Sequence, residues 1–156
     1  MENDRVFLKR ALEIAANGIE EGGGPFGAVI THNNKVIAQS FNKVVLTNDP
    51  TAHAEILAIR EAASVLKTHD LKDCVLYTSC EPCPMCLGAI YWSGIKKIVF
   101  AADRLDAAAS GFSDSLIYDE LALKPEKRQV AFIHVPDEGG KEVFRLWDEF
   151  ENRITY

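Results

Sequence analysis

Two short apolar runs, residues 74–79 and 97–102, flank a helical stretch of the chain. That stretch begins at about Pro84 and is ended by Gly94, and proline and glycine mark helix boundaries in these two positions. Short apolar runs of this kind are typical of strands buried inside a sheet. A strand, a helix and a second strand joined by short links form a right-handed crossover between parallel strands. This segment therefore restricts the chain to folds in which helices cover a sheet.

The rest of the chain supplies the other elements of such a fold. Apolar spacing predicts helices over residues 4–21 and 52–66 and the two strands of a hairpin over residues 26–30 and 35–40. It also predicts a further strand over residues 129–135 and a C-terminal amphipathic helix over about 140–153. The hairpin makes the sheet mixed. We therefore expect an α/β fold, a three-layer α/β/α sandwich with a mixed five-stranded sheet. Because no repeat or linker interrupts it, we expect a single domain over residues 1–156.

Two cysteines stand at the start of the central helix. Cys83 and Cys86 are three residues apart, so their side chains share one face of the first turn. The helix dipole and the free backbone N–H groups there favour thiolates, the form that binds metal. His53 and Glu55 stand at the start of another helix, where side chains lean toward the N-terminus and can meet an ion beyond it. Because zinc takes nitrogen and sulfur ligands, the pattern predicts a zinc centre between two helix starts.

Cys80 leaves a second interpretation open. As a fourth ligand it would close the zinc site, which would then be structural and leave no position for water. Glu55 would then have no function. The Cys83-x-x-Cys86 pair alone is also compatible with a redox pair, and the whole site with a non-catalytic, zinc-stabilised interaction domain. Otherwise Cys80 is a strand-end thiol that does not bind the metal.

Charge and cysteine content limit the partners and the compartment. The formal net charge is -6 and the basic residues are scattered, which disfavours a polynucleotide partner. No apolar run is long enough to span a bilayer, and the N-terminal stretch MENDRVFLKR is too charged for a signal peptide. Clustered cysteines without a secretory leader indicate a reducing compartment. We therefore expect a cytoplasmic protein without a nucleic-acid or membrane partner.

Residues 53–55, His-Ala-Glu, and 82–86, Pro-Cys-Pro-Met-Cys, resemble a known signature. It is the H-x-E and P-C-x-x-C signature of the cytidine deaminase-like superfamily of zinc deaminases. The resemblance implies the same sandwich fold. It also implies that His53, Cys83 and Cys86 bind one Zn²⁺ per subunit, with a water in the fourth position as the nucleophile. Glu55, by the same resemblance, is a proton carrier and not a ligand.

Within this superfamily the chain is most similar to the purine-acting branch, and there to the bacterial guanine deaminases. The similarity rests on the chain length, on the stretches GGPFGAVI and GFSDSLIY, and on an aromatic C-terminal residue. It implies hydrolytic deamination of guanine, a small purine base, to xanthine and ammonia. The alternatives are a tRNA adenosine deaminase, or a deaminase acting on another purine or pyrimidine base or nucleoside.

The resemblance also implies a pocket for the base. Asn42 is expected to donate to guanine O6 or N7, unless it serves only as a turn residue. Asp114 is expected to accept from N1–H or to relay a proton to the leaving amine, unless it serves only as a helix cap. Phe26 is expected to stack on the purine, and Trp92 and the backbone of Ala54 to line the pocket.

The C-terminus carries two further expectations. Tyr156 is expected to cover the active site, in its own subunit or in a neighbour's, unless it only packs on the chain or frays, as most chain ends do. We also expect a homodimer, with the C-terminal helix at about 140–153 packing on the partner subunit.

Overall fold

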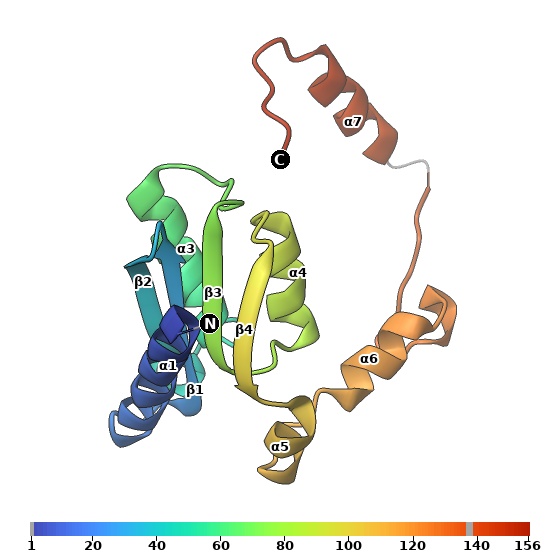
Figure 1. Cartoon of the computed structure of the whole chain (residues 1–156). Coiled ribbons are helices and arrows are strands. Elements are labelled where there is room, and N and C mark those ends of the chain that lie inside the picture. Colours follow the sequence, from blue (N-terminus) through green and yellow to red (C-terminus); the bar gives the residue numbers. More distant parts are fainter. Residues whose placement is uncertain (1, 137–138) are drawn as a thin grey trace. The chain divides into compact units, whose positions relative to one another are not determined.

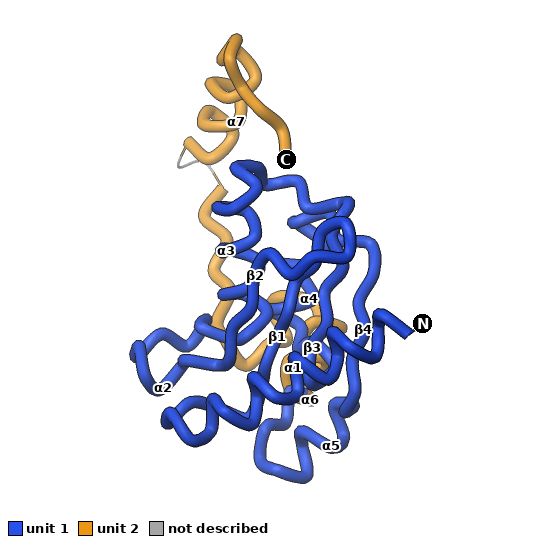
Figure 2. The backbone as a smooth tube through the Cα atoms, turned by 60° about the vertical axis from the view of Figure 1, so that its left-hand side comes forward, with its two compact units in different colours: residues 1–114 blue, residues 115–156 orange. Residues whose placement is uncertain are grey.

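The computed structural model describes residues 2–136 and 139–156 (Figure 1). The chain forms two compact units, residues 1–114 and residues 115–156, which we call the first and the second unit (Figure 2). The first unit contains the sheet and the helices on its faces, and the second unit contains the C-terminal helices. Along the described residues, no helix has the length and apolar character needed to cross a membrane.

The sheet of the first unit has strands in the order β2-β1-β3-β4. Their bounds are Gly24–His32 (β1), Lys35–Asn42 (β2), Cys74–Cys80 (β3) and Lys97–Ala102 (β4). Strand β1 is antiparallel to both β2 and β3, whereas β3 is parallel to β4 across helix α4 (Pro84–Trp92). The β1–β2 hairpin turns at Asn33 and Asn34, which both have the positive φ that asparagine tolerates. The predicted mixed sheet, with its hairpin and parallel crossover, is thus confirmed.

Helices cover both faces of this sheet (Figure 1). Helix α1 (Glu2–Glu20) packs on one face, where Ala11 joins Val29 and Tyr77 in an apolar cluster. Helices α3 (Ala54–Leu66) and α4 pack on the other face. The cluster on that face includes Ala28, Ile30, Ala54, Ala58, Ala62, Leu76 and Ile90. Successive residues of β1 alternate between the two clusters, as the pleat of a strand requires.

Gly27 allows α1 to lie directly on β1. A Cβ atom at this position would lie 2.3 Å from the carbonyl oxygen of Ala11 and 2.6 Å from the backbone nitrogen of Ala15. The backbone N–H of Gly27 also donates to the Ser79 hydroxyl, 3.0 Å away, at the end of β3. The start of β1, which carries Phe26, is therefore held beside the end of β3.

The predicted fifth strand is wrong: among the described residues the sheet has four strands. Residues 129–135 contain no strand, and Val130, Phe132, Ile133 and Val135 are exposed. A strand forms only where its backbone N–H and C=O groups can pair with a neighbouring strand. The second unit contains helices and coil and offers no such neighbour, so a sequence with strand propensity stays irregular.

The structure also contains short helices that the apolar spacing did not predict. These are α2 (Val44–Thr47), α5 (Arg104–Ala109), α6 (Ser115–Ala122) and a 3-10 helix (Pro125–Lys127). The predicted C-terminal helix is present as α7 (Gly140–Glu149), but it ends before residue 153. Phe150 is already extended, and the Arg153 guanidinium donates to the Asp148 and Phe150 carbonyl groups that the helix end leaves exposed.

Candidate metal centre

The first half of the site is the N-terminus of α3. His53 is the residue just before the helix, with extended backbone, and its carbonyl oxygen accepts from the Leu57 N–H. The side chain of His53 makes no capping hydrogen bond to the backbone of the helix, so its imidazole can bind a metal ion. Glu55 lies in the first turn and is 5% exposed. A histidine and a buried carboxylate are thereby placed at one helix start.

The second half of the site is the N-terminus of α4. Cys83 precedes this helix in extended backbone, Pro84 opens it, and Cys86 lies fully buried in its first turn. Helices α3 and α4 pack on the same face of the sheet, so their N-termini bring together residues about thirty positions apart in the chain.

The ligand atoms of His53, Cys83 and Cys86 fit a tetrahedral zinc ion. His53 Nδ1 lies 3.6 Å from Cys83 Sγ and 3.5 Å from Cys86 Sγ, and the three atoms lie within 4.8 Å of one another. Tetrahedral zinc with Zn–S bonds of about 2.3 Å and Zn–N bonds of about 2.0 Å holds sulfur and nitrogen about 3.5 Å apart. The distances therefore match the ion, and these residues account for three of its four positions.

The thiols are already polarised for metal binding. The hydrogen bond from Cys86, followed by that with His53, lowers the pKa of the Cys83 thiol to about 4. The pKa of the Cys86 thiol is raised, first by its hydrogen bond to Cys83 and then by burial. The pKa of the His53 imidazole is raised by its hydrogen bond with Cys83. Without metal, the cysteine pair thus holds one shared negative charge, which attracts a cation.

Cys80 is not part of this group of ligand atoms. It is buried at the end of β3, and its Sγ donates to the carbonyl oxygen of Asp103 at 3.5 Å. Burial, followed by the nearby Glu55, raises the pKa of this thiol to about 11, so it stays protonated at neutral pH. Because Cys80 Sγ bonds the Asp103 carbonyl oxygen and lies outside the group of ligand atoms formed by His53, Cys83 and Cys86, the closed four-residue site loses its support.

Glu55 lies beside the ligands without replacing one of them. Its Oε1 accepts from the Thr78 hydroxyl at 3.2 Å, and its Oε2 accepts from the Cys86 thiol at 3.5 Å. Burial is the main cause that raises the pKa of this carboxyl above its usual value of 4.5. A buried carboxyl with a raised pKa next to a metal site is suited to take up and release a proton.

One predicted pocket residue adjoins the metal ligands in the chain, and a second is linked by a backbone hydrogen bond of its neighbour to the segment before His53. Ala54 is fully buried directly between His53 and Glu55, so only its backbone can face a ligand. Asn42 is buried at the end of β2, and the next residue, Lys43, donates its N–H to the Ala52 carbonyl oxygen at 2.9 Å. The Asn42 Oδ1 accepts from the Val44 N–H at 3.2 Å, so Asn42 forms the turn, and donation from its amide nitrogen to a base stays a prediction.

The remaining predicted residues are more widely distributed. Phe26 is partly buried and packs edge-to-face against Phe112, with ring centroids 5.0 Å apart. Trp92 is exposed at the end of α4, and Asp114 is half-buried at the end of the first unit. Tyr156 belongs to the second unit and is exposed. Their roles toward a substrate stay predictions.

Two residues that contact predicted site residues are not predicted from the sequence: Thr78, which contacts Glu55, and Phe112, which contacts Phe26. Thr78 is predicted only as part of a buried strand. The polar run Thr78-Ser79-Cys80 at the end of this apolar strand could have indicated side chains that contact a site. Phe112 carried no signal of its own. Its contact with Phe26 joins residues more than eighty positions apart, and no local pattern predicts such a contact.

Comparison with known proteins gives consistent similarities. The family model described as the cytidine and deoxycytidylate deaminase zinc-binding region matches residues 1–102. The guanine deaminase of Bacillus subtilis is 50% identical over 155 residues, 99% of each chain. The X-ray structure of guanine deaminase from Bacillus subtilis superposes with a TM-score of 0.95 at 50% identity, covering 97% of this chain and 98% of that one. The tRNA-specific adenosine deaminase of Bacillus subtilis is 38% identical over 120 residues, 77% of this chain and 74% of the other.

Proposed function

The chain belongs to the cytidine and deoxycytidylate deaminase family of zinc-binding proteins, and we propose that it hydrolyses guanine to xanthine and ammonia. This proposal rests on the similarity to the guanine deaminase of Bacillus subtilis, which extends over 99% of both chains. The similarity to the tRNA-specific adenosine deaminase of the same organism covers only 77% of this chain and 74% of the other. The His53, Cys83 and Cys86 ligand set, with Glu55 beside it, supplies the groups that such a hydrolysis needs.

The chemistry divides between the ion and the chain. His53, Cys83 and Cys86 would hold the zinc ion, which would lower the pKa of a bound water and so supply the hydroxide nucleophile. Two thiolates offset the double positive charge of the ion, so a base must help to remove the proton of that water. Glu55 takes this proton and delivers it to a ring nitrogen of guanine as oxygen adds to C2. It then takes the second proton, from the hydroxyl now on C2, and gives it to the exocyclic nitrogen, so that ammonia leaves as the C2–N bond breaks and the C2=O bond of xanthine forms.

Recognition of the base is assigned to the residues that the sequence singled out. The Asn42 amide nitrogen donates to guanine O6 or N7, Phe26 stacks on the ring, and the Ala54 backbone lines the pocket. Support comes from the burial of Asn42 and Ala54, and from the hydrogen bond that joins the residue after Asn42 to Ala52, just before His53. An increase of KM for guanine in Asn42→Ala, with kcat less affected, is the measurement that checks this assignment.

Three further residues complete the proposed pocket. Asp114 accepts from guanine N1–H or relays a proton to the leaving amine, and Trp92 lines the pocket. Tyr156 covers the site in its own subunit or in the partner's. Mixing Tyr156→Ala subunits with inactive Glu55→Gln subunits separates the last two cases, because activity returns in mixed dimers only if Tyr156 acts across subunits.

A substrate assay tests the proposed function. The zinc-loaded protein is incubated with guanine, and in parallel with an adenosine-containing anticodon stem-loop, and ammonia release is measured. We expect release from guanine alone. The acidic net charge disfavours the RNA, because binding an RNA backbone requires clustered basic residues. Turnover of the stem-loop without turnover of guanine would make the chain a tRNA deaminase instead.

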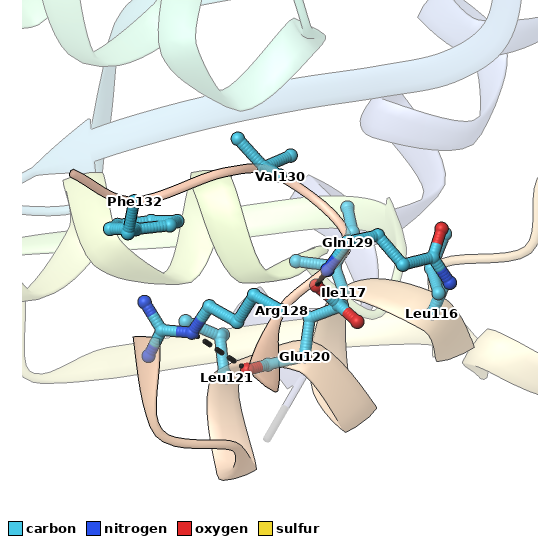
Figure 3. Close-up of a pocket in the computed structure, with 8 residues that line it drawn as sticks. All are labelled: Leu116, Ile117, Glu120, Leu121, Arg128, Gln129, Val130 and Phe132. Atoms are coloured by element: carbon cyan, nitrogen blue, oxygen red, sulfur yellow. Dashed lines mark hydrogen bonds between the residues drawn. The ribbon is translucent and has the colours of Figure 1, made fainter. Parts of the chain in front are cut away.

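We also propose a homodimer in which α7 packs on the partner subunit. The second unit by itself leaves many apolar side chains exposed, among them Val143, Phe144 and Trp147 of α7. This unit also contains an apolar cavity of about 310 Å³ between α6 and the segment that carries Arg128 and Phe132. Figure 3 shows the residues that line it. Apolar surface of this extent is typical of a surface that a partner covers.

Sedimentation equilibrium checks the dimer. We expect twice the chain mass of 17.3 kDa for the wild type. Phe144→Asp should shift the population toward the single chain, because it places a charge within the proposed interface. Lys141→Ala, a change at an exposed polar position of the same helix, should not. A wild-type mass equal to one chain at all concentrations would refute the dimer.

The proposed compartment is the cytoplasm. All four cysteines are free thiols in the structure, and zinc ligation by Cys83 and Cys86 requires that they stay reduced. Cell fractionation followed by the ammonia assay tests this location, and activity recovered only from a membrane or secreted fraction would refute it.

A further inference from the structure

Thr78 lies on β3, between the sheet and the helices that carry the metal ligands. Its side chain is 1% exposed and projects to the same face as Leu76, which packs against α3 and α4. The flanking residue Tyr77 projects to the opposite face, toward α1. A polar hydroxyl is thus buried on an otherwise apolar face, directly behind the metal site.

The hydroxyl of Thr78 contacts the proposed proton carrier. It donates to Glu55 Oε1 at 3.2 Å, and the only other side-chain donor within bonding distance among the described residues is the Cys86 thiol, at 3.5 Å from Oε2. A cysteine that ligates zinc is a thiolate and has no proton to donate. Once Cys86 binds the metal, Thr78 is therefore the side-chain donor that still holds the Glu55 carboxylate.

We infer that Thr78 is a positioning residue that orients the Glu55 carboxylate for proton transfer. This inference rests on the proposed function, because it assigns to Glu55 the role of proton carrier. Holding Oε1 from behind stops rotation of the carboxylate and leaves Oε2 directed at the ligand side, where the water and the substrate meet. Proton transfer depends strongly on such alignment, because the donor and the acceptor must lie within hydrogen-bond distance in the transition state.

A purely structural role for Thr78 makes a different prediction. Threonine and valine have nearly the same shape and both favour strands, so packing alone would be preserved in Thr78→Val. Only the hydroxyl is lost. The variant therefore separates the hydrogen bond to Glu55 from the contribution of the side chain to the core.

The first arm of the test is kinetic. In the zinc-loaded enzyme we expect Thr78→Val to lower kcat for guanine about 10- to 100-fold, the effect of losing one hydrogen bond to a charged group. KM should change less than about twofold, because the lost interaction acts on the transition state and not on binding. Thr78→Ser, which keeps the hydroxyl, should restore most of kcat. If Thr78→Val does not fold, the difference between Thr78→Ser and Thr78→Ala measures the hydroxyl.

Thr31→Val is the matched control. Thr31 is a buried threonine on β1 whose hydroxyl bonds Tyr77 on the opposite face of the sheet. Its loss also removes a buried hydroxyl, but it leaves Glu55 untouched. We expect wild-type kcat in this variant.

The second arm does not depend on turnover. Crystal structures of the zinc-loaded wild type and of zinc-loaded Thr78→Val, in which Cys86 has no proton to donate, should show the Glu55 carboxylate in one orientation in the former, and rotated or split in the latter. An unchanged carboxylate, or an unchanged kcat at full zinc content, would overturn the inference. If the wild type released ammonia from no base, the proposed function would fail, while the carboxylate orientation would still decide the role of Thr78.

Discussion

Replacing Glu55 by glutamine is expected to lower kcat for ammonia release from guanine about 10²- to 10⁴-fold, the usual contribution of a positioned acid–base group. Glutamine has nearly the same size as glutamate but cannot carry the proton from water to the base. Because Glu55 is not a ligand, the zinc content measured on the same sample should stay at one ion per chain. Full activity in this variant would exclude Glu55 as the proton carrier.

A second readout of this variant is its stability. Burial raises the pKa of Glu55 in the folded protein above the value of 4.5, so the folded state favours the neutral carboxyl. The metal-free wild type should therefore lose stability as the pH rises through this raised pKa. Glu55→Gln has no charge to bury and should lack that loss, which thermal unfolding across the pH range measures. Glu61→Gln, at an exposed position of α3, serves as control and should resemble the wild type in both measurements.

Replacing Cys83 by serine is expected to remove both the zinc and the activity. Cys83 Sγ lies 3.6 Å from His53 Nδ1, and the low pKa of its thiol, about 4, makes it the readily available thiolate of the site. Loss of even an outer-shell partner of a metal ligand costs about 10- to 100-fold in affinity, so the loss of a ligand should cost more. Zinc per chain after dialysis against a chelator, together with kcat for guanine, measures the effect.

Cys80→Ser is the control for this prediction. Cys80 is a buried thiol of the same CEPCPMC stretch, but its Sγ faces the Asp103 carbonyl oxygen and its pKa is raised to about 11. Serine keeps a donor for that carbonyl, so zinc and activity should both survive. If Cys80→Ser removed a full equivalent of zinc, the closed structural site would be correct and the catalytic site wrong.

The sequence was most informative where a single element carries the signal. The apolar runs on either side of the Pro84–Trp92 helix predicted the β3-α4-β4 crossover, because helix boundaries and buried strands depend on neighbouring residues. The same kind of pattern over residues 129–135 predicted a strand that is not there. Strand propensity describes side chains that suit a sheet, whereas a strand also needs an adjacent edge, and that depends on the rest of the fold.

The sequence alone predicted His53, Cys83 and Cys86 as zinc ligands and Glu55 beside them, because each pair stands at the start of its own helix. Tertiary structure decided how the pairs meet. Packing of α3 and α4 on one face of the sheet brings His53 to 3.5 and 3.6 Å from two sulfur atoms that lie about thirty residues away. It also turned Cys80 toward Asp103 and placed Thr78 behind Glu55. These contacts join distant parts of the chain, so their geometry follows from strand register and helix packing, which no local pattern specifies.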